Sequence, residues 1–351
     1  MNTWGTKIRL SIFGESHGEA LGIVIDGLKA GTKLNLENIN KFIDRRRAGK
    51  SSFTTSRKEK DEYRILSGYK DGHTTGAPLC VIFENTNTQS KDYENLKVLL
   101  RPNHADYPAA IKFKGFNDIR GGGHFSGRIT LALTFAGAVA MDILEEKGIK
   151  IFSHIKKILD IKDKSFLEFK EVDIDKFKNL KENSLVFIED DLETKTKELL
   201  EKIKLSGNSV GGEIECACYN LPVGLGSPFF DSLESKISHL AFSVPAVKGI
   251  QFGIGFDFTN ILGSEANDLY YLEDDKIKTK TNNNGGILGG LSTGMPLVFS
   301  VVIKPTPSIS IEQETVNVKE MKNDILKISG RHDACIVPRV MPVIEAITAL
   351  A

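Results

Sequence analysis

Three short stretches of this 351-residue chain set a histidine among glycines or beside arginines. His17 stands in FGESHG (13–18), His104 in RPNHAD (101–106) and His124 in RGGGHFSGR (120–128). An imidazole exchanges protons near neutral pH, so each histidine is a candidate general acid or base, with a purely structural hydrogen bond as the alternative. The three glycines before His124 free the backbone to approach a ligand closely, and the start of a following helix favours an anion.

The arginines are confined to two parts of the sequence. The 46 basic residues include only 11 arginines, and residues 129–330 hold 23 lysines and no arginine. An arginine grips phosphate or carboxylate with a planar fork, which lysine lacks. The first third and the extreme C-terminus are therefore predicted to share a site for a polyanion, unless these arginines serve only solubility and packing. The arginines are residues 9, 45, 46, 47, 57, 64, 101, 120, 128, 331 and 339.

Two further segments could contribute to such a site. A glycine-rich run at 285–294 carries no charge and suits a flat aromatic ligand. Lys304–Ser308 leaves a predicted strand with a cation, two hydroxyls and two prolines. Asp333 precedes a predicted helix, where it can act as a general base or as an N-cap.

Composition excludes several classes of protein. Lys+Arg equals Asp+Glu and hydrophobic residues make up 40% of the chain, which argues against a nucleic-acid coat and against disorder. The N-terminus lacks the pattern of a secretory signal, and no membrane association is expected. The four cysteines fit neither a zinc site nor a disulfide framework, so we expect no metal, buried thiols and a reducing, cytoplasmic location.

Common catalytic motifs are incomplete. GESHG (14–18) matches the G-x-S-x-G elbow of serine hydrolases, but a β-rich run follows it where that elbow needs a helix. Gly49-Lys50-Ser51 resembles the end of a P-loop, yet Asp44 stands where the first glycine belongs. No G-x-G-x-x-G follows a strand. A serine hydrolase and a basic-loop protein that binds nucleic acid or phosphosugars stay open as alternatives.

Periodicity predicts which elements carry these residues. Apolar spacing predicts a helix at 36–47 capped by Asn35, and a buried helix at 129–146. Strands come in groups between long helices, which indicates an α+β layered fold, not a doubly wound parallel sheet. Residues 150–205 are rich in Lys, Glu and Asp and are expected to be the most solvated part. Strands are predicted at 7–13, 21–26, 63–67, 78–84, 212–220, 249–258 and 296–304, and further helices at 192–204, 232–241 and 336–350.

Taken in order, the motifs resemble those of the chorismate synthase family from end to end. The matching stretches are FGESHG (13–18), DRRRAG (44–49), TTSR (54–57), ILSGYKDGHTTGAP (65–78), ENTNTQSKDY (84–93), RPNHADY (101–107), RGGGHFSGR (120–128), VPAVKGIQFGIGF (244–256), NNGGILGGLSTG (283–294), KPTPSI (304–309) and GRHDACIVPR (330–339).

This resemblance implies a lyase that converts 5-enolpyruvylshikimate 3-phosphate to chorismate and phosphate by anti-1,4-elimination, the last step of the shikimate pathway. It implies reduced FMN without net redox change, with NADPH only as an upstream electron source. The implied fold is one domain over residues 1–351, a β-α-β sandwich with helices between two antiparallel sheets, assembled as a homotetramer. The motifs leave no room for a reductase domain, so an external flavin reductase or other reductant is expected.

The resemblance also implies residue roles. His17, His104 and Asp333 match catalytic positions, with Asp333 near flavin N5. Arg46, Arg101, Arg128 and Arg331 match the arginines that bind the substrate. His124, Phe125, Ser126, Ala246, Gly289, Lys304, Pro305, Thr306, Pro307, Ser308 and Arg331 match FMN-contacting positions, and Arg46 and Ser52 match NADP-linked positions. Many members have Arg at the positions of His124 and Ser52, Gly at Asn103 and Pro at Ala48.

Overall fold

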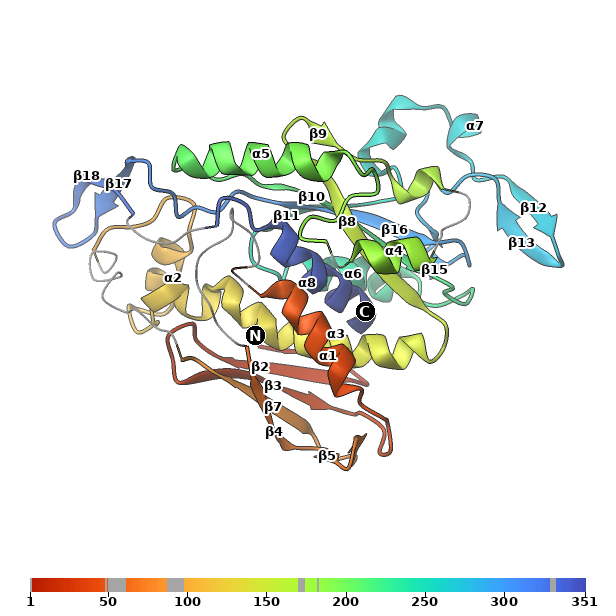
Figure 1. The fold of residues 1–351 in the computed structure, drawn as a ribbon, viewed down its shortest axis with the longest axis horizontal. Helices are drawn as coiled ribbons and strands as arrows, with labels where there is room; N and C mark the ends of the chain where they lie inside the picture. Colours follow the sequence, from red (N-terminus) through yellow and green to blue (C-terminus); the bar gives the residue numbers. More distant parts are fainter. Residues whose placement is uncertain are drawn as a thin grey trace. The chain divides into compact units, whose positions relative to one another are not determined.

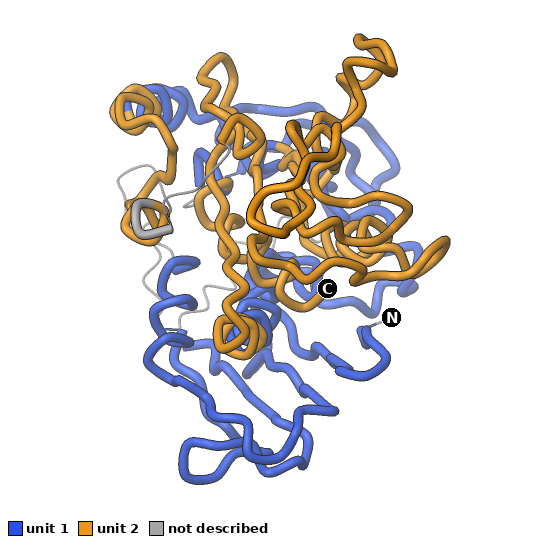
Figure 2. Tube along the Cα trace, turned by 90° about the vertical axis from the view of Figure 1, so that its right-hand side faces the viewer, with its two compact units in different colours: residues 1–139, 198–210, 305–336 blue, residues 140–197, 211–304, 337–351 orange. Residues whose placement is uncertain are grey.

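The computed structural model describes residues 2–47, 49, 61–86, 98–169, 174–181, 183–328 and 333–351. It contains two compact units, coloured separately in Figure 2. Unit 1 comprises Met1–Val139, Glu198–Val210 and Pro305–Ile336, and unit 2 comprises Ala140–Lys197, Gly211–Lys304 and Val337–Ala351. Neither unit is one continuous stretch of sequence, and the single domain over 1–351 stays a prediction.

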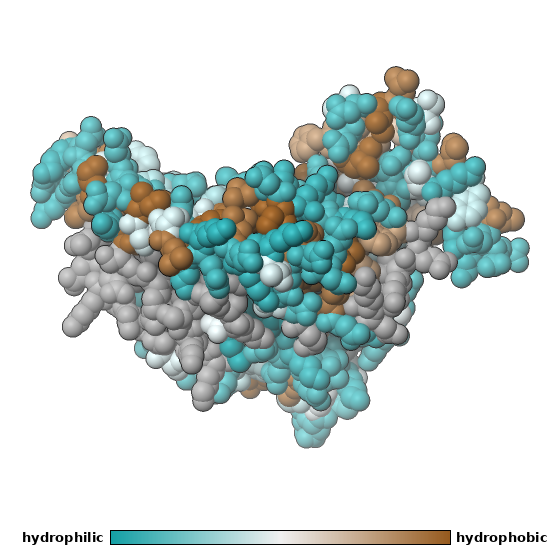
Figure 3. All heavy atoms as spheres, turned by 45° about the horizontal axis from the view of Figure 1, so that its top comes forward, coloured by the Kyte–Doolittle hydropathy of each residue, from teal (hydrophilic) through white to brown (hydrophobic). Residues whose placement is uncertain are grey.

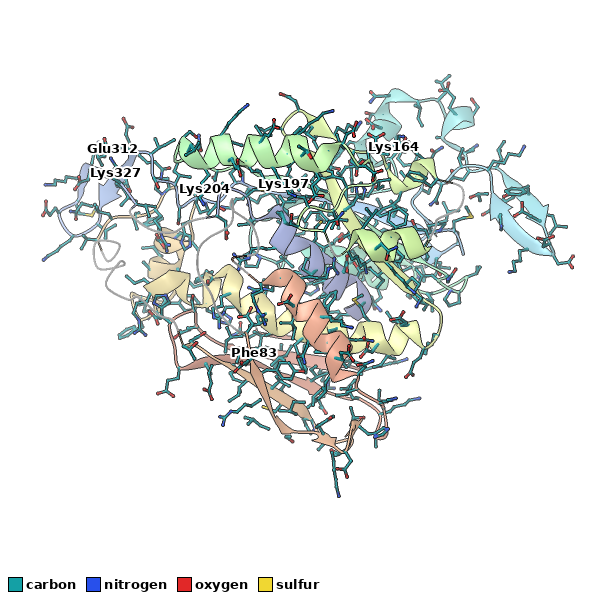
Figure 4. The ribbon with its side chains drawn as sticks, in the orientation of Figure 1. Phe83, Lys164, Lys197, Lys204, Glu312 and Lys327 are labelled. Carbon is teal, nitrogen blue, oxygen red and sulfur yellow. The ribbon has the colours of Figure 1, made fainter. Side chains whose placement is uncertain are left out.

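Unit 1 is built on a five-stranded antiparallel sheet in the order β1-β2-β3-β7-β4 (Figure 1). Alternate residues of β7 face the core, and Phe83, labelled in Figure 4, lies edge-on to Phe135 of helix α3 (Thr130–Glu145) with ring centroids 6.2 Å apart. One face of this sheet therefore packs against α3. The strands are β1 (Thr3–Trp4), β2 (Arg9–Gly14), β3 (Ala20–Asp26), β7 (Leu79–Glu84) and β4 (Tyr63–Ser67).

Helix α1 (Leu36–Arg46) of unit 1 confirms the predicted helix. The Asn35 side chain accepts a hydrogen bond from the backbone N–H of Asn38, which satisfies a donor that the first turn leaves open. Ile39, Phe42 and Ile43 form the buried stripe, and Arg46 in the last turn is buried as well. The same periodicity that buries the apolar face thus carries one arginine into the interior.

Unit 2 is built on a second antiparallel sheet, in the order β11-β16-β10-β8-β9. Helix α8 (Val337–Leu350) contacts this sheet where Ser153 of β8 donates to Glu345 and Cys216 of β10 meets Thr348. Cys216 and Cys218 are buried thiols, and burial raises the pKa of Cys218 to about 12. The strands are β8 (Lys150–Ile158), β9 (Ile161–Lys162), β10 (Gly212–Tyr219), β11 (Val247–Phe252) and β16 (Leu297–Ile303).

The remaining elements are shorter or join the two units in sequence. In unit 1 they are β5 (Tyr69–Lys70), β6 (His73–Thr74), α2 (Asp106–Lys112), η3 (Arg120–Phe125), η4 (Gly127–Ile129), β17 (Gln313–Asn317) and β18 (Lys322–Leu326). In unit 2 they are η5 (Phe166–Glu168), α4 (Ile174–Leu180), η6 (Phe229–Asp231), α6 (Leu233–Ala241), η7 (Gly255–Asn260), α7 (Gly263–Ala266), β12 (Tyr270–Glu273), β13 (Lys276–Thr279), β14 (Ile287–Leu288) and β15 (Leu291–Ser292). Helices α3 (Thr130–Glu145) and α5 (Leu192–Leu205) have residues in both units.

Helices mixed with antiparallel sheets confirm the predicted α+β class. Two local expectations were wrong. The strand predicted at 249–258 ends at Phe252, because Gly253 and Gly255 take left-handed φ values that an extended strand does not use. The 150–205 segment is not uniformly solvated, since four residues of β8 are buried: Ile151, Phe152, His154 and Ile155.

The surface carries mixed chemistry. On the face in Figure 3, hydrophobic residues lie in patches among hydrophilic ones. Lys164 and Lys197, labelled in Figure 4, form exposed ion pairs with Glu189 and Glu193. Within the described residues, one helical stretch, Gly127–Glu145, is long and apolar enough to cross a membrane, and 61% of its most apolar window is buried, as in the core helix of a globular protein.

Candidate active site

A tight turn between β2 and β3 carries Ser16 and His17 into the interior of unit 1. Both residues are buried, and Gly18 N–H closes the turn on Glu15 O. The chain then enters β3 at Ala20, so the turn joins two strands. The strand-to-helix elbow of a serine hydrolase is therefore absent from this turn. The hydroxyl of Ser16 is buried without a hydrogen-bond partner among the described residues.

The three glycines of η3 place this turn next to His104. Gly121, Gly122 and Gly123 have φ of 60°, 84° and 54°. A Cβ on Gly121 would lie 2.7 Å from Nε2 of His17, and a Cβ on Gly122 would lie 3.4 Å from Nε2 of His104. Consecutive glycines thus lie against the rings of the two histidines that the sequence predicts to be catalytic. At Gly121 the ring of His17 is so close that only glycine fits.

His104 is oriented by a carboxylate at the start of α2. Asp106 accepts from Nδ1 of His104 at 2.6 Å and from Nε and Nη2 of Arg101 at 2.8 and 2.7 Å. Burial alone would raise the pKa of Asp106, but the hydrogen bonds from Arg101 and His104 outweigh it and hold this pKa well below its ordinary value. Asp106 is therefore ionised, Nδ1 of His104 carries a proton, and Nε2 is the ring nitrogen that faces Gly122.

Two buried arginines meet at a second carboxylate. Arg128 of η4 donates from Nη1 to Asp61 at 3.0 Å, and Nη1 of Arg46 lies 3.9 Å from the other oxygen of Asp61. Arg46 also donates to Thr130 Oγ1 and to the carbonyl of Gly127. These contacts bring together Arg46 and Arg128, which lie 82 positions apart in the sequence.

Asn85 connects the arginine pair to the histidine turn. Its Oδ1 accepts from Nε of Arg128 at 2.6 Å, and its Nδ2 donates to the carbonyls of Glu15 and Gly18. A continuous set of contacts therefore runs through unit 1 from the arginines to His17, and from there across the glycines to His104. This arrangement sets proton-exchanging rings beside buried cations.

The predicted cofactor segment 124–126 lies next to this cluster. Nδ1 of His124 is 2.8 Å from the carbonyl of Gly14, which fixes this nitrogen as the donor. Ser126 caps η4 by accepting from the N–H of Arg128 at 3.3 Å. Phe125 is partly exposed and packs against Phe113.

Other predicted residues lie in separate parts of the two units. In unit 1, Asp333 is half-buried beside Ala334, whose carbonyl accepts from Val210 N–H. Thr306, in the predicted 305–308 segment, has a buried hydroxyl without a hydrogen-bond partner among the described residues. Arg331 and Ser52 lie outside the described residues, as does Ala48.

Two of the three predicted residues of unit 2, Ala246 and Lys304, are in contact. Ala246 takes a left-handed φ of 74°, and its carbonyl accepts from the N–H of Lys304 at 2.9 Å. Burial, with the nearby charge of Lys248, lowers the pKa of Lys304. Gly289 lies in the turn between β14 and β15 with φ of 57°.

Sequence reasoning missed several residues of the cluster. Asp61 lies in a strongly charged run, RKEKDE (57–62), which is typical of a solvated loop. Asn85 and Thr130 are uncharged residues in no catalytic motif. Only Asp106 had a signal, since it stands beside His104 and five positions from Arg101.

An α+β fold that holds histidines beside buried arginines suits an enzyme that acts on a small molecule. The chain belongs to the chorismate synthase family, because the family model described as chorismate synthase matches residues 8–351. It is a lyase of the shikimate pathway.

Named relatives cover nearly the whole chain. The chorismate synthase of Methanococcoides burtonii is 46% identical over 99% of this chain and 94% of that protein. Those of Thermococcus kodakarensis and Dehalococcoides mccartyi are 44% and 43% identical over 98% and 99% of this chain, and 94% of each relative is covered. A crystal structure of chorismate synthase superimposes with a TM-score of 0.77 at 28% identity, covering 98% of this chain and 90% of that one.

Proposed function

We propose that this chain catalyses the anti-1,4-elimination of phosphate from 5-enolpyruvylshikimate 3-phosphate, requiring reduced FMN without net redox change. The C–O bond to phosphate breaks with its electron pair leaving on phosphate, a C–H bond breaks with loss of a proton, and a new C=C bond forms. The observation that carries this proposal is the unit 1 cluster of two histidines and two buried arginines, in a chain of the chorismate synthase family.

The arginines suit the charge of this substrate, which carries one phosphate and two carboxylates. Arg46 and Arg128 are at least nine-tenths buried, so their attraction for an anion is weakly screened. Arg101 is held by Asp106, and in the proposal it adds positive charge beside His104. Arg331 completes the proposed set of substrate-binding arginines.

The two histidines are proposed to donate and accept protons. Asp106 fixes the proton of His104 at Nδ1, which leaves Nε2 to hold or release the proton used in turnover. His17 is proposed to donate a proton to the leaving phosphate, which would otherwise depart with an additional charge. Asp333 is proposed to assist the loss of the substrate proton.

Two buried hydroxyls support the proposed flavin site. The buried hydroxyls of Ser16 and Thr306 have no hydrogen-bond partner among the described residues and offer polar contacts to a ligand. Residues 124–126, Ala246, Gly289, 304–308 and Arg331 would hold FMN. When bound, reduced FMN supplies an electron-rich ring that can lend negative charge to the substrate as phosphate leaves.

We further propose that Arg46 and Ser52 contact NADPH where it serves as the electron source, and that an external reductase supplies the reduced flavin. A homotetramer in the cytoplasm, with the two sheets as outer layers around central helices, is proposed from the family resemblance.

The test is an anaerobic assay with chemically reduced FMN and 5-enolpyruvylshikimate 3-phosphate. We expect chorismate and phosphate in equal amounts, with no net oxidation of flavin. Phosphate release without chorismate, or equal turnover with oxidised flavin, would refute the proposal. A nucleic-acid-binding protein would instead show no turnover and a steep loss of binding with salt.

A further inference from the structure

Asp61 is a buried carboxylate with no part in the roles proposed above. Its side chain is only 3% exposed, and its two oxygens face different guanidinium groups, Oδ1 that of Arg128 and Oδ2 that of Arg46. Its backbone is left-handed, with φ of 50°, a conformation that Asp and Asn tolerate better than most residues. An Asn at position 61 can adopt the same backbone conformation. The substitution Asp61→Asn therefore removes the negative charge without new backbone strain.

The charges explain what this carboxylate does. Two guanidinium groups are buried together, and like charges repel strongly where water is excluded. The single negative charge of Asp61 reduces the charge of this trio from two positive units to one. Neutral acceptors bind three further donors: Asn85 and Thr130 each accept from a guanidinium Nε, and the Gly127 carbonyl accepts from Nη2 of Arg46.

A site that must release an anion as well as bind it needs moderate affinity. Without the negative charge of Asp61 between the two buried guanidinium groups, product phosphate would bind more tightly and leave more slowly. The carboxylate of Asp61 between the two guanidinium groups weakens their attraction for phosphate and also holds both groups in place. Asp61 thus acts both on the orientation of the arginines and on the release of phosphate.

We propose that Asp61 is a positioning residue that orients Arg46 and Arg128 and limits the affinity of the site for phosphate. This inference rests on the proposed role of the two arginines in binding the anionic substrate.

The test uses Asp61→Asn, with Asp71→Asn as its matched control. Asp71 is exposed, lies in unit 1 and has a φ of 48°, so the control makes the same chemical change on nearly the same backbone. The melting temperature of each purified full-length variant is measured against inorganic phosphate concentration, without flavin or substrate. We expect Asp61→Asn to bind phosphate at least about tenfold more tightly than the wild type, and Asp71→Asn to match the wild type. Equal phosphate dependence in Asp61→Asn and wild type, including no response in either, overturns the proposal.

The double variant Asp61→Asn/Arg128→Gln covers the case in which Asp61→Asn does not fold. It restores a single positive charge among these positions, so we expect it to fold and to respond to phosphate no more strongly than the wild type. A double variant that fails to fold, or that binds phosphate as tightly as Asp61→Asn should, also overturns the proposal. Wild-type chorismate formation is assayed in parallel, so failure of the proposed function appears there and not in the phosphate titration.

Discussion

Asp106 binds Nδ1 of His104 at 2.6 Å while the same carboxylate holds Arg101 through two of its guanidinium nitrogens. One acidic side chain therefore sets both the tautomer of an imidazole and the position of a guanidinium. Because Asp106 begins α2 and Arg101 and His104 precede it, the whole arrangement comes from one short loop. This contact gives the first prediction.

Replacing Asp106 with Asn should reduce kcat by about tenfold to a hundredfold, with a smaller change in KM. The amide is uncharged and can present N–H instead of oxygen to Nδ1, so the imidazole loses its fixed tautomer. Steady-state kinetics under anaerobic conditions measure the effect. Glu312→Gln is the control, since it removes a carboxylate from an exposed pair with Lys327, both labelled in Figure 4. A wild-type kcat in Asp106→Asn would show that Asp106 does not orient His104 for turnover.

The two histidines should each be needed for turnover. His17→Ala and His104→Ala are expected to lower kcat by about one to three orders of magnitude at saturating substrate, because each removes a proton-exchanging group. His73→Ala serves as control, since His73 is exposed in the β5–β6 hairpin. Chorismate formation measures the rate, and melting temperatures check that the fold persists. Full turnover in either site variant removes that histidine from the proposed mechanism.

Much of the local structure could be predicted, because short-range physics decides it. Helix α1 follows from the cap at Asn35 and from apolar spacing, and β7 follows from the short apolar run Leu79–Phe83. The close packing at the triple glycine was also predictable in kind, since such a run permits backbone approach. The family motifs identified the histidines and arginines that the fold gathers in unit 1.

Asp61 was beyond sequence reasoning for a physical reason. Asp61 and Arg128 are 67 positions apart, and one charge in a run of charged residues is expected to be solvated until tertiary structure buries it. The same holds for His154, which lies in a segment rich in Lys and Glu yet is fully buried on β8. Composition describes the average environment of a segment, whereas pairing across strands decides the environment of one residue.

The contact between Gly121 and His17 gives a prediction about backbone space. In Gly121→Ala the new methyl group would lie 2.6 Å from Cδ2 and 2.7 Å from Nε2 of His17, so the ring must move. We expect kcat to fall by about tenfold or more. The left-handed φ should also cost about 1–2 kcal/mol of stability.

Gly72→Ala separates these two effects. Gly72 has a φ of 84° and nothing within 4 Å of the added Cβ, so it carries the backbone cost without the clash. Its stability should fall by a similar amount while kcat stays at the wild-type value. Equal kcat values in the two alanine variants would mean that the position of the His17 ring does not limit turnover.

A buried histidine in unit 2 should make stability depend on pH. His154 lies between Asp163, 2.8 Å from Nδ1, and Glu215, 3.0 Å from Nε2, and Glu215 also binds Lys156 and Ser165. Burial alone would lower the pKa of His154, but hydrogen bonds to Asp163 and Glu215 outweigh it and raise this pKa above 6.5. Hydrogen bonds from His154 likewise outweigh burial and lower the pKa of Glu215 to about 2.

The raised pKa of His154 and the lowered pKa of Glu215 act at opposite ends of the dependence of stability on pH. A raised histidine pKa contributes stability that is complete below pH 6.5 and is lost as pH rises toward the folded-state pKa, by up to about 1.4 kcal/mol per pH unit. A lowered glutamate pKa contributes stability that is present above pH 4.5 and is lost as pH falls toward about 2. Between these limits the imidazole of His154 and the carboxylate of Glu215 are both charged and compensate each other.

His154→Gln should therefore lower the free energy of unfolding at pH 6 by about 3–5 kcal/mol, because it removes the cation that lies between the buried carboxylates of Asp163 and Glu215. It should also remove the decline above pH 6.5 that we expect of the wild type, since the titrating group is gone. Urea unfolding at intervals from pH 5 to 9 measures both effects, with His73→Gln as the exposed control. If His154→Gln lost stability above pH 6.5 in parallel with the wild type, the alkaline limb would belong to another group and the protonated state of buried His154 would be disproved.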